Sequence, residues 1–136
     1  MAKEFWINLP VKDLAKSKAF FSALGFAFHP RHLDSEHMAG LVVGDKGVLV
    51  MLFPESTFKA FTKSEVADPS QAAEVLFSID ASSKAQVEEI VNKAVQAGGT
   101  VYSMPQGQGG MYGACFADVD GHRWNVLYMQ PDLDAQ

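Results

Sequence analysis

The segment that most constrains the fold is residues 109–129, GGMYGACFADVDGHRWNVLYM. An apolar run over residues 111–117 leads into DVDG at 118–121, and an aromatic-rich run follows at 122–129. The Asp-Gly pair supplies the positive φ that a tight chain reversal needs. The pattern therefore predicts a β-hairpin.

The second strand of this hairpin alternates between two kinds of side chain. Trp124 and Val126 are apolar, whereas Arg123 and Asn125 are polar. Successive side chains of a strand point to opposite faces of a sheet. We therefore expect a sheet with a helix packed on its apolar face and a pocket in front of its polar face.

The chain carries an earlier, weaker copy of this hairpin at residues 41–51, and each hairpin follows a strand, a helix and a strand. An internal duplication is the simplest account of two such halves. The sequence predicts an α+β fold of two βαβββ modules within one domain, 1–136. Module one spans about 1–54, a connector spans 55–72, and module two spans 73–131.

In the first half, the alternation of residues 5–9 predicts a strand that ends at Pro10, because proline has no amide hydrogen to donate. Asp13 is a candidate cap for a helix over residues 14–24. Gly25 stands where a helix favours a left-handed residue, so we expect the helix to end there.

In the second half, residues 74–79 alternate as a strand does. Ser83 and Gln86 have the spacing of a capping box at the start of a helix. We expect a further strand at residues 100–104 and a loop at residues 105–110, PQGQGG.

The composition limits the classes of function and location. The chain has 136 residues, is 48% hydrophobic, and has a formal net charge of −5 with no cluster of Lys or Arg. We therefore expect no nucleic-acid partner and no membrane partner. The N-terminus lacks a signal-peptide pattern, and a lone cysteine, Cys115, suits a reducing compartment and a buried, inert thiol. These features predict a cytoplasmic protein.

Three histidines, His29, His32 and His37, lie close together in a polar segment. One interpretation is a metal site, since imidazole is a common ligand. The other is a solvated loop, which the spacing favours because it matches no helical face.

The sequence resembles the vicinal oxygen chelate superfamily, which includes glyoxalase I, bleomycin-resistance proteins and extradiol dioxygenases. The motifs are NLPVKDLAKS at 8–17, FFSALGF at 20–26, GMYG at 110–113 and DVDGHRW at 118–124. The chain is most similar to bacterial proteins described as lactoylglutathione lyase-related. The resemblance implies two βαβββ modules whose sheets curl around a shared cleft.

The resemblance also implies four positions where the superfamily's enzymes hold a divalent metal: Trp6, Met51, Glu74 and Asn125. The tryptophan indole is not a metal ligand, the methionine thioether suits soft metals, and the asparagine amide is a neutral ligand. Only Glu74 is a good ligand for these metals, and similar proteins often carry Glu in place of Asn125. We therefore expect no metal ligands and no cofactor, a recruited divalent metal being the disfavoured alternative.

Strand alternation predicts the residues that line the cleft and could contact a small-molecule ligand. Glu74 is the candidate catalytic residue, as a general base if it is desolvated and unpaired, or else a structural ion pair with Arg123. The other predicted cleft residues are Trp6, Asn8, Met51, Phe53, Leu76, Arg123 and Asn125.

Three functions are open at this point. The first is a protein that binds a small, partly apolar molecule in the cleft between the modules without the family metal. The second is a glyoxalase-like metal-dependent lyase or isomerase that uses Glu74. The third is a non-catalytic dimerising module with a self-filled cleft. A homodimer is expected, because each sheet leaves edges to cover and superfamily members commonly associate.

Overall fold

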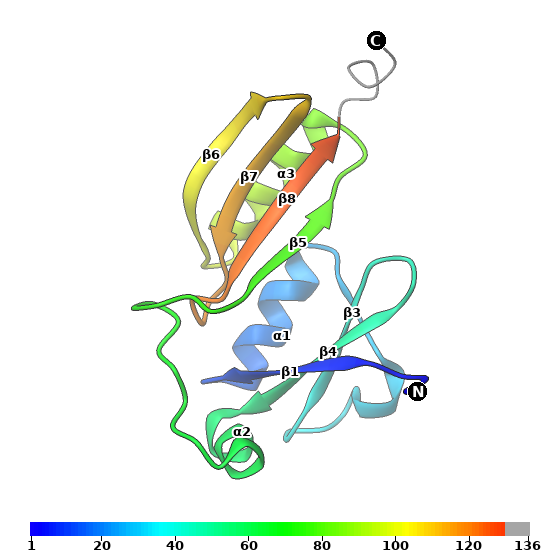
Figure 1. Ribbon diagram of the computed structural model, residues 1–136, viewed down its shortest axis with the longest axis vertical. Coiled ribbons are helices and arrows are strands. Elements are labelled where there is room, and N and C mark those ends of the chain that lie inside the picture. The colour runs from blue at the N-terminus through cyan, green and yellow to red at the C-terminus, as the bar shows by residue number, and fades with distance from the viewer. Residues whose placement is uncertain (130–136) are drawn as a thin grey trace. The chain divides into compact units, whose positions relative to one another are not determined.

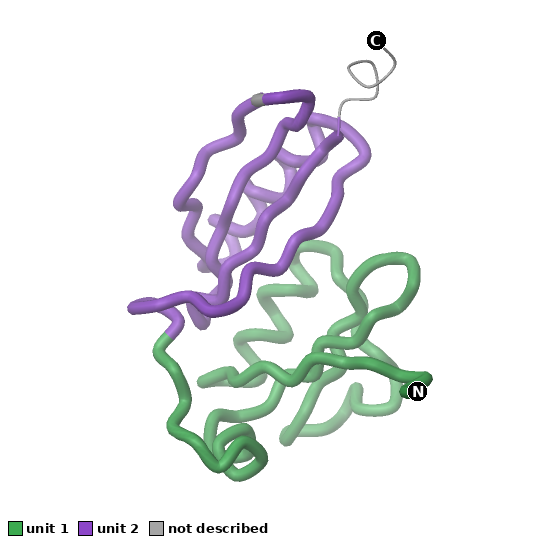
Figure 2. The backbone as a smooth tube through the Cα atoms, in the orientation of Figure 1, with its two compact units in different colours: residues 1–68 green, residues 69–136 purple. Residues whose placement is uncertain are grey.

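The computed structural model describes residues 1–129, apart from the side chain of Gln108. The chain divides into two compact units, Met1–Asp68 (unit 1) and Pro69–Gln136 (unit 2) (Figure 2). The predicted end of module two at residue 131 lies outside the described residues. Each unit is described separately below.

Unit 1 contains one four-stranded sheet of order β1-β4-β3-β2. Strand β1 runs parallel to β4, and the other neighbours are antiparallel. Helix α1 lies against this sheet, and α2 follows β4 within the predicted connector (Figure 1). The elements are β1 (Trp6–Val11), α1 (Leu14–Ala23), β2 (Ala27–Phe28), η1 (Pro30–His32), β3 (Ala39–Val43), β4 (Val48–Pro54) and α2 (Glu55–Thr62).

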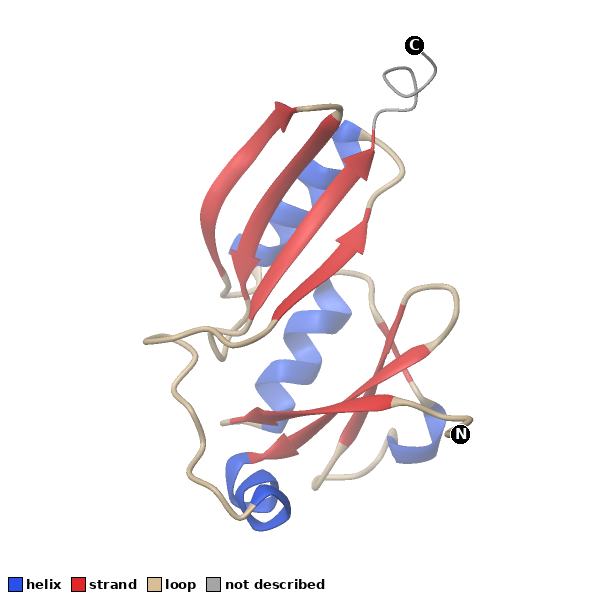
Figure 3. Ribbon diagram, in the orientation of Figure 1, coloured by secondary structure: helices blue, strands red, loops and turns tan. Residues whose placement is uncertain are grey.

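Unit 2 has the same plan, with sheet order β5-β8-β7-β6, β5 parallel to β8, and α3 behind the sheet (Figure 3). Its elements are β5 (Leu76–Asp80), α3 (Lys84–Gln96), β6 (Thr100–Gln108), β7 (Met111–Ala117) and β8 (Arg123–Met129). The predicted α+β fold of two βαβββ modules is confirmed.

The helices start and stop where the sequence predicts. The Asp13 carboxylate accepts a hydrogen bond from the backbone N–H of Lys16 at 3.1 Å, and the Ser83 hydroxyl accepts one from Gln86 N–H at 3.1 Å. Gly25 follows α1 with a φ of 95°, which only glycine adopts at low cost. Within residues 1–129, no helix is both long enough and apolar enough to cross a membrane.

The core of each unit lies between its helix and one face of its sheet. In unit 1, Phe20 and Phe21 of α1 are buried together with Leu41 and Leu52 of the sheet. In unit 2, Val87 and Val91 of α3 pack with Ala114 and Val126, while Trp124 is fully buried. In unit 2 the face opposite α3 is the open side of the sheet. In unit 1 the face opposite α1 is met at one end by α2, whose Phe61 ring lies 5.2 Å from that of Phe53 in β4.

Two predicted boundaries are wrong, and both involve proline. Strand β1 continues through Pro10, which pairs in register with Phe53, and β6 continues to Gln108 where a loop was predicted at 105–110. Both strands are edges of their sheets, where a missing N–H costs no ladder hydrogen bond. The pairing of β6 with β7 shifts register between Ser103 and Gln106, which accommodates the proline between them.

The turn between β7 and β8 is organised by a buried carboxylate. Asp118 accepts hydrogen bonds from the backbone N–H of His122 at 3.0 Å and from the indole N–H of Trp124 at 3.1 Å. Burial raises the pKa of the Asp118 carboxyl above its usual value, while the charge of His122 and the Trp124 hydrogen bond oppose this shift. The predicted hairpin turn is confirmed, and the core tryptophan is tied to it.

Candidate functional site

The helix-free face of the unit 2 sheet (the open face of unit 2) brings together several predicted cleft residues. Leu76 pairs with Arg123, and Ser78 pairs with Asn125, on neighbouring parallel strands. Asn125 also pairs with Cys115 of β7. Paired residues point to the same side of a sheet, so these side chains share one face.

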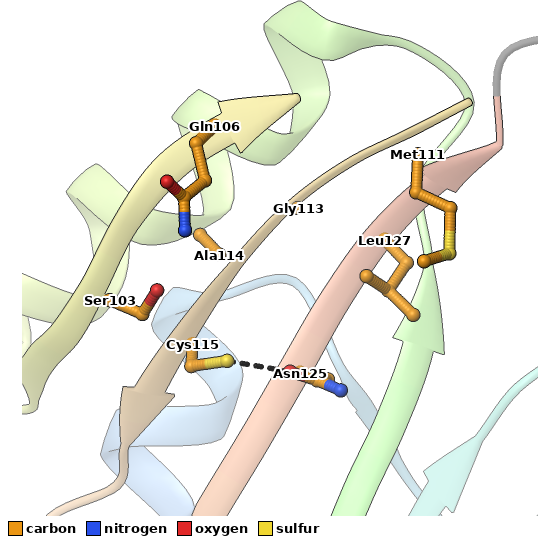
Figure 4. Close-up of a pocket in the computed structure, with 8 residues that line it drawn as sticks. All are labelled: Ser103, Gln106, Met111, Gly113, Ala114, Cys115, Asn125 and Leu127. Atoms are coloured by element: carbon orange, nitrogen blue, oxygen red, sulfur yellow. Dashed lines mark hydrogen bonds between the residues drawn. The ribbon is translucent and has the colours of Figure 1, made fainter. Parts of the chain in front are cut away.

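A pocket of about 160 Å³ opens on this face, over β6, β7 and β8 (Figure 4). The Cys115 thiol donates a hydrogen bond to Asn125 Oδ1 at 2.6 Å, and Asn125 Nδ2 lies 3.4 Å from Ser78 Oγ. The lining combines polar groups with apolar walls: Ser103, Gln106, Met111, Gly113, Ala114, Cys115, Asn125 and Leu127. Such a mixture is typical of small-molecule sites, although this pocket is smaller than a drug-sized one.

Gly113 leaves room for the Leu127 side chain, which packs over it in the wall of this pocket. A Cβ at position 113 would lie 2.5 Å from Leu127 Cδ2 and 3.0 Å from the carbonyl oxygen of Val126. Any other residue would push Leu127 out of its place, so this glycine is required by packing and not by a turn.

Arg123 and Tyr102 border the pocket residues on the same sheet. The Arg123 guanidinium carbon lies 4.1 Å from the centre of the Tyr102 ring, which is a cation–π contact. Burial raises the pKa of the Tyr102 hydroxyl, and Cys115 adds to the rise while Arg123 opposes it. These contacts fix the guanidinium group beside the thiol and amide of the pocket.

Glu74, the candidate catalytic residue, belongs to unit 2. It lies two residues before β5 and is exposed to solvent. The ion pairs of residues 1–129 do not include one between Glu74 and Arg123, whose guanidinium lies over the Tyr102 ring. The exposed position also lacks the desolvation that the general-base hypothesis requires.

In unit 1, the predicted cleft residues also share one face of the sheet, the face opposite α1. Asn8 pairs with Met51, and Pro10 pairs with Phe53. Met51 is only 8% exposed, whereas Trp6 on the edge strand is 54% exposed. Apolar side chains fill the centre of this face in unit 1.

Superimposing the two halves of the sequence on their own landmarks matches Trp6 to Glu74 and Met51 to Asn125, and the strand registers do not support both matches. Asn8, which is two positions after Trp6, pairs with Met51. Ser78, which is four positions after Glu74, pairs with Asn125. Strand alternation has a period of two, so it cannot distinguish alignments that differ by two residues. That ambiguity explains the error.

The four family metal positions do not form a suitable donor set. Trp6 offers no lone pair, Met51 offers a buried thioether, and the Asn125 oxygen already accepts the Cys115 thiol proton. Across residues 1–129, no group of three His, Cys, Asp or Glu side chains is placed to hold a metal. The residues present therefore do not fit the superfamily's metal.

Most residues of the pocket, Ser103, Gln106 and Cys115 among them, were not in the predicted cleft. The predicted loop at 105–110 removed Gln106 from the sheet, and Cys115 was expected to be buried and inert but is partly exposed. Tyr112 lies on the other face of the sheet, where its hydroxyl donates to Glu88 of α3 at 2.8 Å. An edge-strand reading of the proline-containing segment would have found Gln106.

Comparisons with known proteins agree with this architecture. A family model described as bleomycin resistance protein-like N-terminal matches residues 4–44. A structure of a hypothetical protein from S. aureus is 34% identical, covers 94% of this chain and 95% of its own, and has a TM-score of 0.84. No curated protein matches the sequence.

Two more distant structures share the fold. A glyoxalase/bleomycin resistance protein/dioxygenase family enzyme from Burkholderia phytofirmans is 19% identical over 91% of this chain and 96% of its own, with a TM-score of 0.75. A fosfomycin resistance protein from Listeria monocytogenes, complexed with Mn(II) and sulfate, is 18% identical over 95% and 92%, with a TM-score of 0.66.

Proposed function

Because the chain belongs to the vicinal oxygen chelate superfamily, we propose that it binds a small, partly apolar molecule without the divalent metal of that superfamily's enzymes. The observation that carries the proposal is the pocket on the open face of unit 2. This pocket sits beside Asn125, the family metal position in β8, and its donors are neutral amide, hydroxyl and thiol groups.

The proposed binding mode follows from the lining. The Met111 and Leu127 side chains offer apolar contact to a ring or short aliphatic chain. The amide of Asn125 and the side chains of Ser103 and Gln106 offer hydrogen bonds that orient a polar group of the ligand. Because residue 113 is a glycine, no side chain at this position displaces Leu127 from the pocket wall.

A lyase or isomerase that uses Glu74 receives less support. The carboxylate is exposed and lies outside β5, away from the paired residues of the pocket wall. A general base must reach the proton that it removes, and the described contacts bring no second acid or base to Glu74. Ligand binding is therefore the function that we propose.

The test is a titration with small neutral aromatic amides, beginning with benzamide, followed by two-dimensional amide NMR. We expect saturable shifts at Ser103, Cys115 and Asn125, and about tenfold weaker binding in Asn125→Leu, which loses the orienting hydrogen bonds. The control Asn92→Leu, on the exposed side of α3, should bind as the wild type does. Shifts that avoid the pocket throughout such a series would contradict the proposal.

We also propose that the protein is a homodimer. Strands β1 and β5 are sheet edges that carry the exposed apolar side chains of Trp6 and Leu76, and Phe5 and Val75 beside them are exposed as well. Exposed apolar edges favour association. Light scattering after size exclusion should give twice the chain mass, and Trp6→Lys should lower it; a monomeric wild type would refute the dimer.

A further inference from the structure

Unit 1 has a second pocket, of about 140 Å³, on the helix side of its sheet where α1 meets β3 and the segment around η1. Its lining includes Lys18 and Ser22 of α1 on one side and Gly40 of β3, which pairs with Met51, on the other. Two of the three clustered histidines, His29 and His32, line it together with Lys18.

The cationic side of this pocket is held in place by hydrogen bonds. Lys18 Nζ donates to the carbonyl oxygen of Ser35 at 2.9 Å and is partly buried. An ammonium group has three donors, so this contact leaves two of them for a ligand. The backbone N–H of His29 donates to the carbonyl oxygen of Gly40 at 2.7 Å, which fixes His29 to β3.

The tautomer of His29 follows from its contact with η1. Its Nδ1 atom accepts the backbone N–H of Arg31 at 3.1 Å. In the neutral imidazole the other nitrogen, Nε2, must then carry the proton and act as a donor. Lys18 and His29 therefore both present N–H groups, and His32 adds a second imidazole.

The rest of the lining is mostly apolar, with one hydroxyl from Ser22 and no carboxylate. Phe28 and Leu33 contribute hydrophobic wall, and no Asp or Glu lines the space. An ammonium group repels a metal cation, so this donor set opposes the metal interpretation of the histidines. A group with negative charge and a short apolar body matches both parts of the lining.

We infer that this pocket is a binding site for a small aliphatic carboxylate, with the carboxylate at Lys18 and the histidines and the hydrocarbon against Phe28 and Leu33. Hydrogen bonds between charged groups are roughly twice as strong as neutral ones, so Lys18 supplies most of the recognition. The site is independent of the pocket in unit 2, and it can exist whether or not that pocket binds a ligand.

The test is an NMR titration of the full chain with sodium butyrate, butyramide and inorganic phosphate at constant ionic strength. We expect butyrate to give saturable shifts at Phe28, His29 and Gly40, with butyramide at least about tenfold weaker because it lacks the charge. Phosphate should also be weaker, since it has no apolar body.

Matched variants separate this site from general electrostatics. Lys18→Gln and His32→Gln should each weaken butyrate binding, the first by about tenfold, and His32→Gln leaves the Lys18 contact with Ser35 in place. Lys16→Gln, on the exposed side of the same helix, removes the same charge and should change nothing. Equal affinity for butyramide, tighter binding of phosphate, an equal loss in Lys16→Gln, or no saturable shift would each overturn the inference.

Discussion

The two units share one topology but differ in the side chains on the sheet face opposite the core helix. The turns correspond, since Gly47 N–H donates to Gly44 at 3.1 Å and Gly121 N–H donates to Asp118 at 3.0 Å. Counting from these turns places Met51 of unit 1 at the position of Asn125 of unit 2. Met51 is a buried thioether beside Gly40, whereas Asn125 is an amide that binds Cys115 at the edge of a pocket.

This difference distinguishes the residues that form the core from the residues that could contact a ligand. In both units the helix side carries buried apolar residues and the strand order is the same. The face opposite α1 carries the buried Met51 in unit 1, whereas the open face of unit 2 carries Asn125 in the wall of a pocket. Two modules with the same topology and the same kind of core can therefore differ in whether the face opposite the helix carries a pocket.

The largest expected effect distinguishes the two tryptophans. Trp124 is fully buried and stacks on Phe77 with ring centres 4.7 Å apart, whereas Trp6 is 54% exposed. Trp124→Ala should lower the free energy of unfolding by about 3–5 kcal/mol. Trp6→Ala should change it by less than about 1 kcal/mol. Urea denaturation followed by circular dichroism measures both, and equal losses would contradict the assignment of the core.

A smaller effect compares a glycine from the sheet of each unit. Gly113→Ala places a Cβ against Leu127 and a backbone carbonyl, so we expect a loss of about 1–3 kcal/mol. Gly40→Ala meets Met51 Sδ at 3.3 Å and His29 Cβ at 3.2 Å, and a flexible thioether can move, so the loss should stay below about 1 kcal/mol. The same denaturation experiment would expose an error if Gly40→Ala proved the costlier change.

The smallest effect concerns the two turns and depends on pH. Because burial raises the pKa of Asp118 above 3.8, the folded state holds this proton more tightly than the unfolded state. Its contribution to stability is therefore present at low pH and is lost as pH rises through the raised pKa. Asp118→Asn should remove this decline, whereas Asp45→Asn in the unit 1 turn should keep it. A wild-type slope in Asp118→Asn would refute the assignment.

The sequence predicted the frame because its determinants are local. Asp13, Ser83 and Gly25 mark the helix ends by their own hydrogen bonds and torsions, and the structure confirms them. The site was predicted less well, because its geometry depends on register and on edges. Pro105 predicts the end of a strand unless the strand is known to be an edge, as β6 is. The match of Glu74 to Trp6 came from superimposing the two halves of the sequence, and strand alternation does not reveal a shift of two residues.

The central proposal is that the chain binds a small molecule in the unit 2 pocket without the superfamily's metal. Elemental analysis of purified, untagged protein tests it directly, after incubation with Zn²⁺, Ni²⁺, Mn²⁺ or Fe²⁺ and extensive dialysis. The donor set of Trp6, Met51, Glu74 and Asn125 predicts that no stoichiometric metal is retained. Retention of about one equivalent per chain that disappears in Glu74→Ala would contradict the account and favour a metal-dependent enzyme.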